Sequence, residues 1–303
     1  MDIEQKIIRT IAYFTVFRHP LTADEVFAYL WCRAGESREE VVGRLNELVK
    51  AGKLDFKYGF YFFAGNEADV EKRRSAVVPG DVMLRRARTA KKILSVIPFV
   101  EAIFVCNSVA AETANENSDI DLFIVTRPGR IWSVRFFSNV LMLAFGLRTA
   151  KGHDSGRVCL SFFVDENNLD IGGMRVAEDD VYLVYWLRQI LPVFDPKNIL
   201  EKIIEKNVWA NIYAGSQPVL KKTESKCILK KIAEKILDAG AGNYLEKKLQ
   251  EWQWKKLRPE LKAKIKEGSS EVVVSGGVLK FHENDARINI REEWTNIFAK
   301  YGA

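Results

Sequence analysis

The sequence predicts an α+β protein with three regions: a helical N-terminal region closed by a β-hairpin, a central mixed sheet with helices, and a largely helical C-terminal region. Apolar residues recur first at helical spacing, then in short runs typical of strands, and from Glu178 onward at helical spacing again. The length of 303 residues accommodates two or three domains. We place the domains at residues 1–66, 67–177 and 178–303.

The composition indicates an ordinary globular protein, with 48% hydrophobic and 28% charged residues. The chain has no run of about eighteen apolar residues, so we expect no membrane-spanning helix and no membrane partner. The start MDIEQKIIRT puts acids before any apolar run, unlike a secretory signal. The four cysteines form no CxxC pair, which favours reduced thiols and a cytoplasmic location over a zinc ribbon or a redox motif.

The net charge of +6 is unevenly spread along the chain. Residues 1–66 carry nine acids and nine bases, whereas residues 197–267 carry nine acids and seventeen bases. The basic excess in the second segment would attract nucleic acid or a polyphosphate. We favour the alternative interpretation, a lysine-rich helix face in contact with solvent.

The N-terminal region shows the element order of a winged helix-turn-helix domain. Apolar residues at helical spacing predict a first helix over residues 3–17. Thr22 with Glu25, and Ser37 with Glu40, have the spacing of capping boxes, which predict helices that begin just after Thr22 and Ser37. Two short runs around a Tyr-Gly turn then predict a hairpin. The predicted ranges are 23–32 and 38–51 for the later helices, and 53–57 and 60–64 for the two strands.

The third helix of this region would be the recognition helix if the domain bound DNA. It carries Arg38, Arg44 and Lys50, but also three glutamates, and the region as a whole is neutral. Contacts between positive side chains and phosphates dominate the affinity of proteins for nucleic acid. We therefore favour a protein–protein or intramolecular docking role for this domain over DNA binding.

Short apolar runs in the central region predict a sheet. The expected strands span residues 99–106, 119–126 and 158–164, with an amphipathic helix over 130–145. This order predicts a core with helices on one side of the sheet. A charged linker helix followed by a second helix is expected over residues 67–95. The C-terminal region shows helical periodicity over 179–191, 199–212 and 229–256, then a hairpin around Gly276-Gly277 and a closing helix over 291–301.

Two acids at the start of the second central strand carry the strongest chemical signal. Asp119 and Asp121 are two residues apart, so their side chains project from one face of the strand, about 6.5–7 Å apart along the backbone. Ile120 points the other way, into the core. Carboxylates in this arrangement can share a hard cation, and Mg²⁺ (or Mn²⁺) binds to one or two carboxylates together with phosphate oxygens.

Asn107 and Ser108 follow the first central strand directly. A strand-to-helix turn of this kind offers a hydroxyl group and backbone N–H groups to phosphate oxygens. Ten residues separate Ser108 from Asp119. We therefore expect Asn107 and Ser108 to hold phosphate beside a cation bound by the two acids.

The order of a serine after one strand, about ten residues, and then Asp119-Ile120-Asp121-Leu122 on the next strand resembles the signature of the nucleotidyltransferase superfamily. This resemblance covers roughly residues 96–166. It implies that the acids hold one or two metal ions, which bind a nucleoside triphosphate (NTP) and activate an attacking hydroxyl, with release of pyrophosphate. The wider chain resembles a group of prokaryotic proteins that join a winged helix to such a domain. The residues that carry this resemblance are Pro98-Phe99-Val100, Ser118-Asp119-Ile120-Asp121-Leu122, Arg127 to Trp132 and Cys159 to Phe162. The resemblance implies transfer of a nucleoside monophosphate (NMP) from an NTP to an unknown hydroxyl acceptor.

Two positions depart from the superfamily signature. Asn107 stands where the family has glycine; asparagine tolerates a positive φ, so the turn is retained while the contact with phosphate is weakened. The third acid of the family corresponds to Ser161, with Asp165 and Glu166 as substitutes at the end of that strand. Loss of one ligand would weaken a second metal site. The alternative function is therefore a non-catalytic regulator or binding module that uses the winged helix for DNA or protein contact.

Basic residues surround the helix after the second central strand. Arg127, Arg130 and Arg135 are candidates to neutralise the triphosphate and stabilise charge on the leaving pyrophosphate, with ordinary solvated arginines as an equal alternative. His282 and Asp285 form an HxxD pattern, for which we favour a turn over a metal-ligand pair. Weaker candidates for a triphosphate contact precede the third strand: Lys151, His153 and Arg157.

Overall fold

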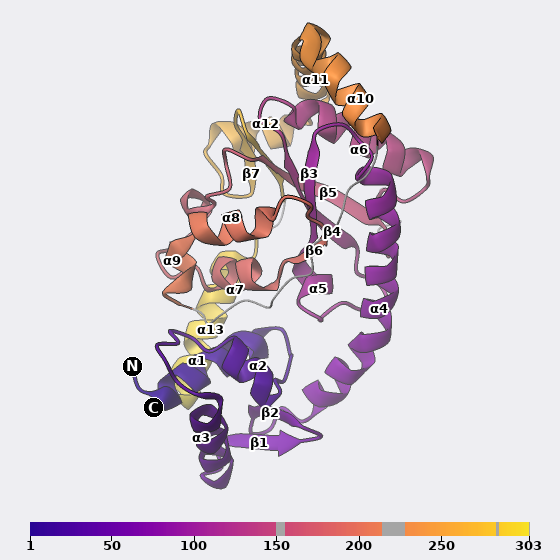
Figure 1. Cartoon of the computed structure of the whole chain (residues 1–303). Helices are drawn as coiled ribbons and strands as arrows, with labels where there is room; N and C mark the ends of the chain where they lie inside the picture. Colours follow the sequence, from indigo (N-terminus) through magenta and orange to yellow (C-terminus); the bar gives the residue numbers. More distant parts are fainter. Residues whose placement is uncertain (150–154, 214–227, 283–284, 303) are drawn as a thin grey trace.

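The computed structural model describes residues 1–149, 155–213, 228–282 and 285–302. Figure 1 shows the N-terminal helices at one end of the molecule, a central sheet, and a helical pair, α10 and α11, that projects from the other end. Among the described residues, no helix is both long enough and apolar enough to cross a membrane.

The N-terminal region contains the helices and the hairpin that the sequence predicts. Both capping boxes are formed, one from Thr22 and Glu25 and the other from Ser37 and Glu40. The second helix ends earlier than predicted, because the backbone N–H of Trp31 donates to the hydroxyl of Thr10 instead of continuing the helix. The elements are α1 (Ile3–Val16), α2 (Ala23–Ala28), α3 (Arg38–Lys50), β1 (Leu54–Lys57) and β2 (Phe60–Phe63).

A single long helix, α4 (Ala68–Leu94), connects the hairpin to the sheet, as Figure 1 shows. The prediction of two separate helices over residues 67–95 is wrong. Pro79 lies inside the helix, where a proline removes one backbone hydrogen bond. Tertiary contacts at both ends stabilise the helix despite this lost hydrogen bond. Arg73 pairs with Glu25 near its start, and Ala87 is fully buried near its end.

The central sheet has six strands in the order β6-β3-β4-β5-β8-β7. Only the β4–β5 pair is parallel, so the sheet is mixed and the predicted α+β class is confirmed. Strand β6 was not predicted, because Pro192 interrupts its short apolar run; proline is tolerated there since β6 is an edge strand. The strands are β3 (Val100–Val105), β4 (Ile120–Thr126), β5 (Val158–Asp165), β6 (Leu191–Phe194), β7 (Val272–Val274) and β8 (Val278–Phe281).

Helices cover both faces of this sheet, so the expectation of helices on one side is wrong. Ile103 and Ile124 belong to a core shared with α4 and α6 (Ile131–Ala144). Phe104 and Phe123 belong to a second core shared with α7 (Val181–Gln189) and α1. All six residues of β3 are buried, which is the pattern of a strand covered on both faces.

The C-terminal region contributes helices and three of the strands. The predicted hairpin is present as β7 and β8, which pair antiparallel and extend the sheet beyond β5. The last helix packs along the first, and Figure 1 shows the two chain ends close together. The remaining helices are α5 (Asn107–Ala110), η1 (Gly172–Met174), α8 (Ile199–Lys206), α9 (Val208–Asn211), α10 (Ile228–Ile236), η2 (Leu237–Ala241), α11 (Gly242–Lys256), α12 (Pro259–Lys266) and α13 (Arg287–Tyr301).

Candidate functional site

The structure brings the two predicted acids together at the start of β4. Asp119 immediately precedes the strand and Asp121 is its second residue, while Ile120 between them is fully buried on the other side. One ligand atom from each of Asp119, Asp121 and Cys159 lies within 4.8 Å of the other two. The alternation of side chains along a strand therefore places both carboxylates where one cation can contact them.

The third position of this cluster is occupied by Cys159, not by an acid. Because β4 and β5 are parallel, their starts lie side by side, and Asp121 pairs in register with Cys159. The sequence had assigned this position to Ser161, whose hydroxyl instead lies 2.8 Å from Nε2 of His282. A register shift between Asp121 and Phe123 moves the later residues of β5 by one position relative to β4.

Neither of the proposed substitutes supplies the missing carboxylate. Asp165 pairs with Thr126 at the opposite end of β4, and its carboxylate accepts from the backbone of Asn167 at 3.0 Å. Glu166 forms an ion pair with Lys197 at 3.2 Å. The cluster therefore contains two carboxylates and one thiol. Sequence reasoning missed Cys159 because a cysteine within an apolar strand has the pattern of a core residue.

Burial governs the charge state of this cluster. Burial, followed by the charge of Asp119, raises the pKa of Asp121 to about 6, against the hydrogen bond that Asn107 donates. Burial and the charge of Asp121 raise the pKa of Cys159 to about 12, so its thiol stays protonated at neutral pH. A divalent cation would relieve the repulsion between the carboxylates, whereas a protonated thiol is a poor ligand for it.

Asn107 adopts a left-handed backbone conformation, as expected for this turn. Its φ is +55°, in the left-handed region that asparagine tolerates. Its Nδ2 donates to Oδ2 of Asp121 at 2.8 Å, and its Oδ1 accepts from Nε1 of Trp186 at 3.0 Å and from the hydroxyl of Tyr182 at 3.2 Å. The side chain of Asn107 therefore orients Asp121. Ser108 follows it and lines a neighbouring cavity of about 340 Å³.

The structure does not bring Arg127 and Arg130 to the acidic pair, which corrects their assignment as triphosphate ligands at this site. Arg127 lies six residues beyond Asp121, about 20 Å away at the other end of β4. Its guanidinium pairs with Glu234 at 3.1 Å and Asp238 at 2.8 Å, and Arg130 donates to Asn243 at 2.7 Å. Both arginines thus attach the α10–α11 pair to the sheet.

The remaining basic candidates have separate placements. Arg135 is partly buried on α6 and donates to Gln253 at 2.6 Å. Burial lowers the pKa of Arg135 to about 10. The backbone carbonyl of Arg157 accepts from Ile120 at 2.8 Å, so Arg157 lies beside the start of β4. Lys151 and His153 lie outside the described residues.

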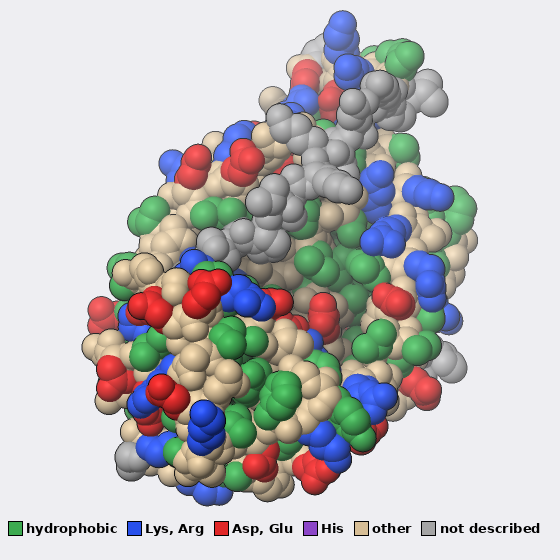
Figure 2. All heavy atoms as spheres, turned by 60° about the horizontal axis from the view of Figure 1, so that its bottom comes forward, with side chains coloured by type: hydrophobic (Ala, Val, Ile, Leu, Met, Phe, Trp, Pro, Cys, Tyr) green, Lys and Arg blue, Asp and Glu red, His purple; other side chains and the backbone are tan. Residues whose placement is uncertain are grey.

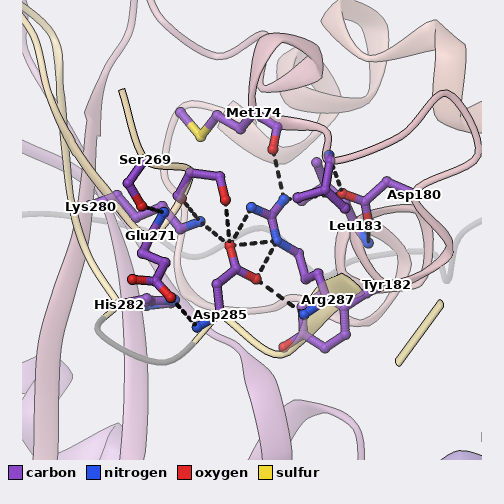
Figure 3. Close-up of polar contacts among 12 residues, drawn as sticks. Met174, Asp180, Tyr182, Leu183, Ser269, Glu271, Lys280, His282, Asp285 and Arg287 are labelled. Atoms are coloured by element: carbon purple, nitrogen blue, oxygen red, sulfur yellow. Dashed lines mark hydrogen bonds and ion pairs between the residues drawn. The ribbon is translucent and has the colours of Figure 1, made fainter. Parts of the chain in front are cut away.

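Figure 3 shows Asp285 in a network of ion pairs with Lys280 and Arg287. No cluster of metal-ligating groups among the described residues contains His282 or Asp285. Asp285 instead accepts from Nε of Arg287 at 2.7 Å, and Arg287 also contacts Asp180 at 3.1 Å. Burial, together with the charge of Lys280, lowers the pKa of His282 to about 4, which makes it neutral at pH 7. The sequence signal for this network is that Asp285 and Arg287 lie two residues apart. The ion pair between them was not predicted.

Comparison with known proteins found no matching family model, no similar curated protein and no similar solved structure. The functional argument therefore depends on the site itself.

Proposed function

We propose that this protein is a metal-dependent nucleotidyltransferase that transfers an NMP from an NTP to a hydroxyl acceptor. The observation that carries the proposal is the convergence of Asp119 and Asp121 at the start of β4, within 4.8 Å of each other and of Cys159. The strand–turn–helix–strand order from β3 through α5 to β4, followed by α6 and the parallel strand β5, supports a nucleotidyltransferase fold.

The donor set fits one Mg²⁺ or Mn²⁺ ion. Both metals accept carboxylate oxygens, and a triphosphate supplies further oxygen ligands. Asp119 and Asp121 would hold the ion, which when bound neutralises negative charge on the triphosphate. Asn107 orients Asp121 through its amide, and Ser108 follows it in the same turn and lines the cavity.

We further propose that the N-terminal region is a winged helix that docks within the molecule instead of binding DNA. On α3, Arg38 pairs with Asp24 at 2.6 Å and Arg44 pairs with Glu47 at 2.6 Å. Paired arginines contribute less to phosphate binding, which requires uncompensated positive charge. On the other side of this region, Tyr13 of α1 stacks on Tyr185 of α7 with ring centroids 4.1 Å apart.

A specific observation favours a second candidate, a non-catalytic binding module. Cys159 stands where a third carboxylate would complete a two-metal site, and its thiol is protonated at neutral pH. A site with two carboxylates can hold one cation and its nucleotide, but it has fewer ligands for a second ion.

Metal and nucleotide binding test both candidates. We expect titration calorimetry to detect Mn²⁺ and Mn²⁺-NTP binding by the wild type, weakened by about tenfold or more in Asp121→Asn. The matched control Asp81→Asn, at an exposed position on α4, is expected to bind as the wild type does. Pyrophosphate release from α-labelled NTPs, offered with RNA or protein extracts as acceptors, separates the candidates: release supports transfer, and binding without release supports the module. An unchanged Mn²⁺ affinity in Asp121→Asn would contradict both.

A further inference from the structure

A cavity of about 340 Å³ lies on the face of the sheet covered by α7, next to the turn that carries Asn107 and Ser108. We propose that this cavity binds an uncharged, planar heteroaromatic molecule of the size of a nucleoside. The proposal goes beyond the transferase assignment, because it concerns the space that α1, α7 and α13 line beyond the turn of Asn107 and Ser108, and because it requires neither metal nor catalysis.

The size and the walls of the cavity match a small aromatic ligand. Small-molecule sites begin at about 300 Å³ and are lined mainly by apolar and aromatic side chains. Aromatic walls favour planar ligands, since ring stacking adds attraction beyond the burial of apolar surface. Six aromatic side chains line the cavity: Tyr13, Phe14, Phe17, Phe162, Tyr182 and Trp186.

The charged groups at the edge of the cavity already neutralise one another. Arg287 pairs with Asp285 and with Asp180, and Lys280 lies 3.6 Å from Asp285, as Figure 3 shows. His282 is neutral at pH 7 because burial lowers its pKa to about 4. Two cations and two carboxylates therefore balance, and an ionised ligand would lose its hydration without gaining a partner charge. This balance favours an uncharged ligand.

Two polar groups of the wall are available to such a ligand. The Gln189 amide and the Ser108 hydroxyl line the cavity, and neither side chain makes a hydrogen bond to another described residue. Gln189 is only 9% exposed, so its amide has little access to bulk water. A carboxamide presents a donor beside an acceptor, the pattern that the edge of an adenine ring complements. The amide therefore selects heteroaromatic rings over plain hydrocarbon rings.

Residues near both ends of the chain line the cavity. Tyr13 and Phe14 come from α1, Phe17 directly follows that helix, and Ile290 comes from α13. The molecular face drawn in Figure 2 is hollowed at its centre, with hydrophobic side chains along the hollow. A ligand in the cavity would contact the N-terminal region and the sheet region together, so its binding stabilises their contact.

Adenosine is the probe for the test, with AMP and ribose as controls, in buffer containing EDTA. We expect calorimetry to show saturable adenosine binding, affinity lower by about tenfold or more for AMP, and none for ribose. Ala111→Phe, which puts a ring into the cavity, is expected to abolish binding, whereas Ala64→Phe at an exposed position leaves it unchanged. Gln189→Leu, which keeps the side-chain size, is expected to weaken binding by about tenfold.

Absence of saturable adenosine binding by the wild type, or unchanged binding by Ala111→Phe and Gln189→Leu, would overturn the proposal. Asp119→Asn separates it from the transferase assignment: adenosine binding is expected to persist in this variant, whereas NMP transfer is expected to be lost. Loss of adenosine binding in a folded Asp119→Asn protein would show that the cavity is not an independent site.

Discussion

At the scale of single residues, two ion pairs of the same kind differ in burial. Asp285 and Arg287 are 8% and 5% exposed, and the guanidinium also contacts Asp180 and the carbonyl of Met174. Asp179 and Arg291 are 33% and 41% exposed and form a single pair at 2.7 Å. Because both arginines lie on α13, the two pairs compare burial within one helix.

We predict that Asp285→Asn lowers the free energy of unfolding at pH 7 by about 3 kcal/mol, since it removes one of the two carboxylates that pair with a buried guanidinium. The matched change Asp179→Asn is expected to cost less than about 1 kcal/mol, as for exposed pairs. Urea unfolding of both variants measures the difference. Equal losses would contradict the role of burial.

The same pair has a defined pH dependence. Burial raises the pKa of Asp285, but the hydrogen bond and charge of Arg287, with the charge of Lys280, outweigh it and hold the pKa well below its ordinary value. A carboxyl group lowered in this way stabilises the fold fully above its unfolded pKa of about 4, and that contribution is lost as the pH falls further. The difference between wild type and Asp285→Asn should therefore shrink below pH 4.

At the scale of elements, α4 contains a proline and a glycine in its interior, and both residue types disfavour a helix. Pro79 lies near the middle of a 27-residue helix and is followed by Gly80, which has no atom within 4 Å of the position of an added Cβ. Proline in a helix interior costs about 3 kcal/mol and glycine about 1 kcal/mol relative to alanine.

We predict that Pro79→Ala raises the free energy of unfolding by about 1–3 kcal/mol, because it restores a backbone hydrogen bond. Gly80→Ala, the neighbouring control, should raise it by less, about 0.5–1 kcal/mol. Urea unfolding measures both. A destabilised Pro79→Ala protein would indicate that the proline shapes α4 to fit the contacts at its two ends.

At the scale of the whole molecule, the last helix closes the fold against the first. Trp294 of α13 is 1% exposed, and its Nε1 donates to the backbone carbonyl of Arg9 at 3.0 Å. Tyr301 stacks on Phe63 of the hairpin with ring centroids 4.0 Å apart. The N-terminal region is thus packed against residues that lie 238 to 285 positions later, which couples its stability to that of the rest of the chain.

We predict that Trp294→Ala destabilises the protein by about 3–5 kcal/mol, the cost of removing a large buried side chain. Trp252→Ala, at a half-exposed position on α11, should cost less than about 1 kcal/mol. Urea unfolding followed by limited proteolysis measures the loss and shows whether the N-terminal region opens first. Similar effects of the two changes would contradict the closing role of α13.

Features that depend on residues close together in the chain could be predicted from the sequence alone. The capping boxes at Thr22 and Ser37 and both hairpins follow from spacings of two to four residues, and so does the shared face of Asp119 and Asp121. The mixed α+β class follows from the change of apolar period along the chain.

The distant residues that contact those local features could not be predicted, because long-range packing selects them. The parallel pairing of β4 and β5 put Cys159, and not Ser161 or Asp165, beside Asp121. The length of β4 separated Arg127 from the acids. Strand order and register arise from long-range packing, and a shift of one residue exchanges the two faces of a strand. Local spacing therefore predicts that the two acids share one face of the strand, whereas the pairing of β4 with β5 determines their third neighbour.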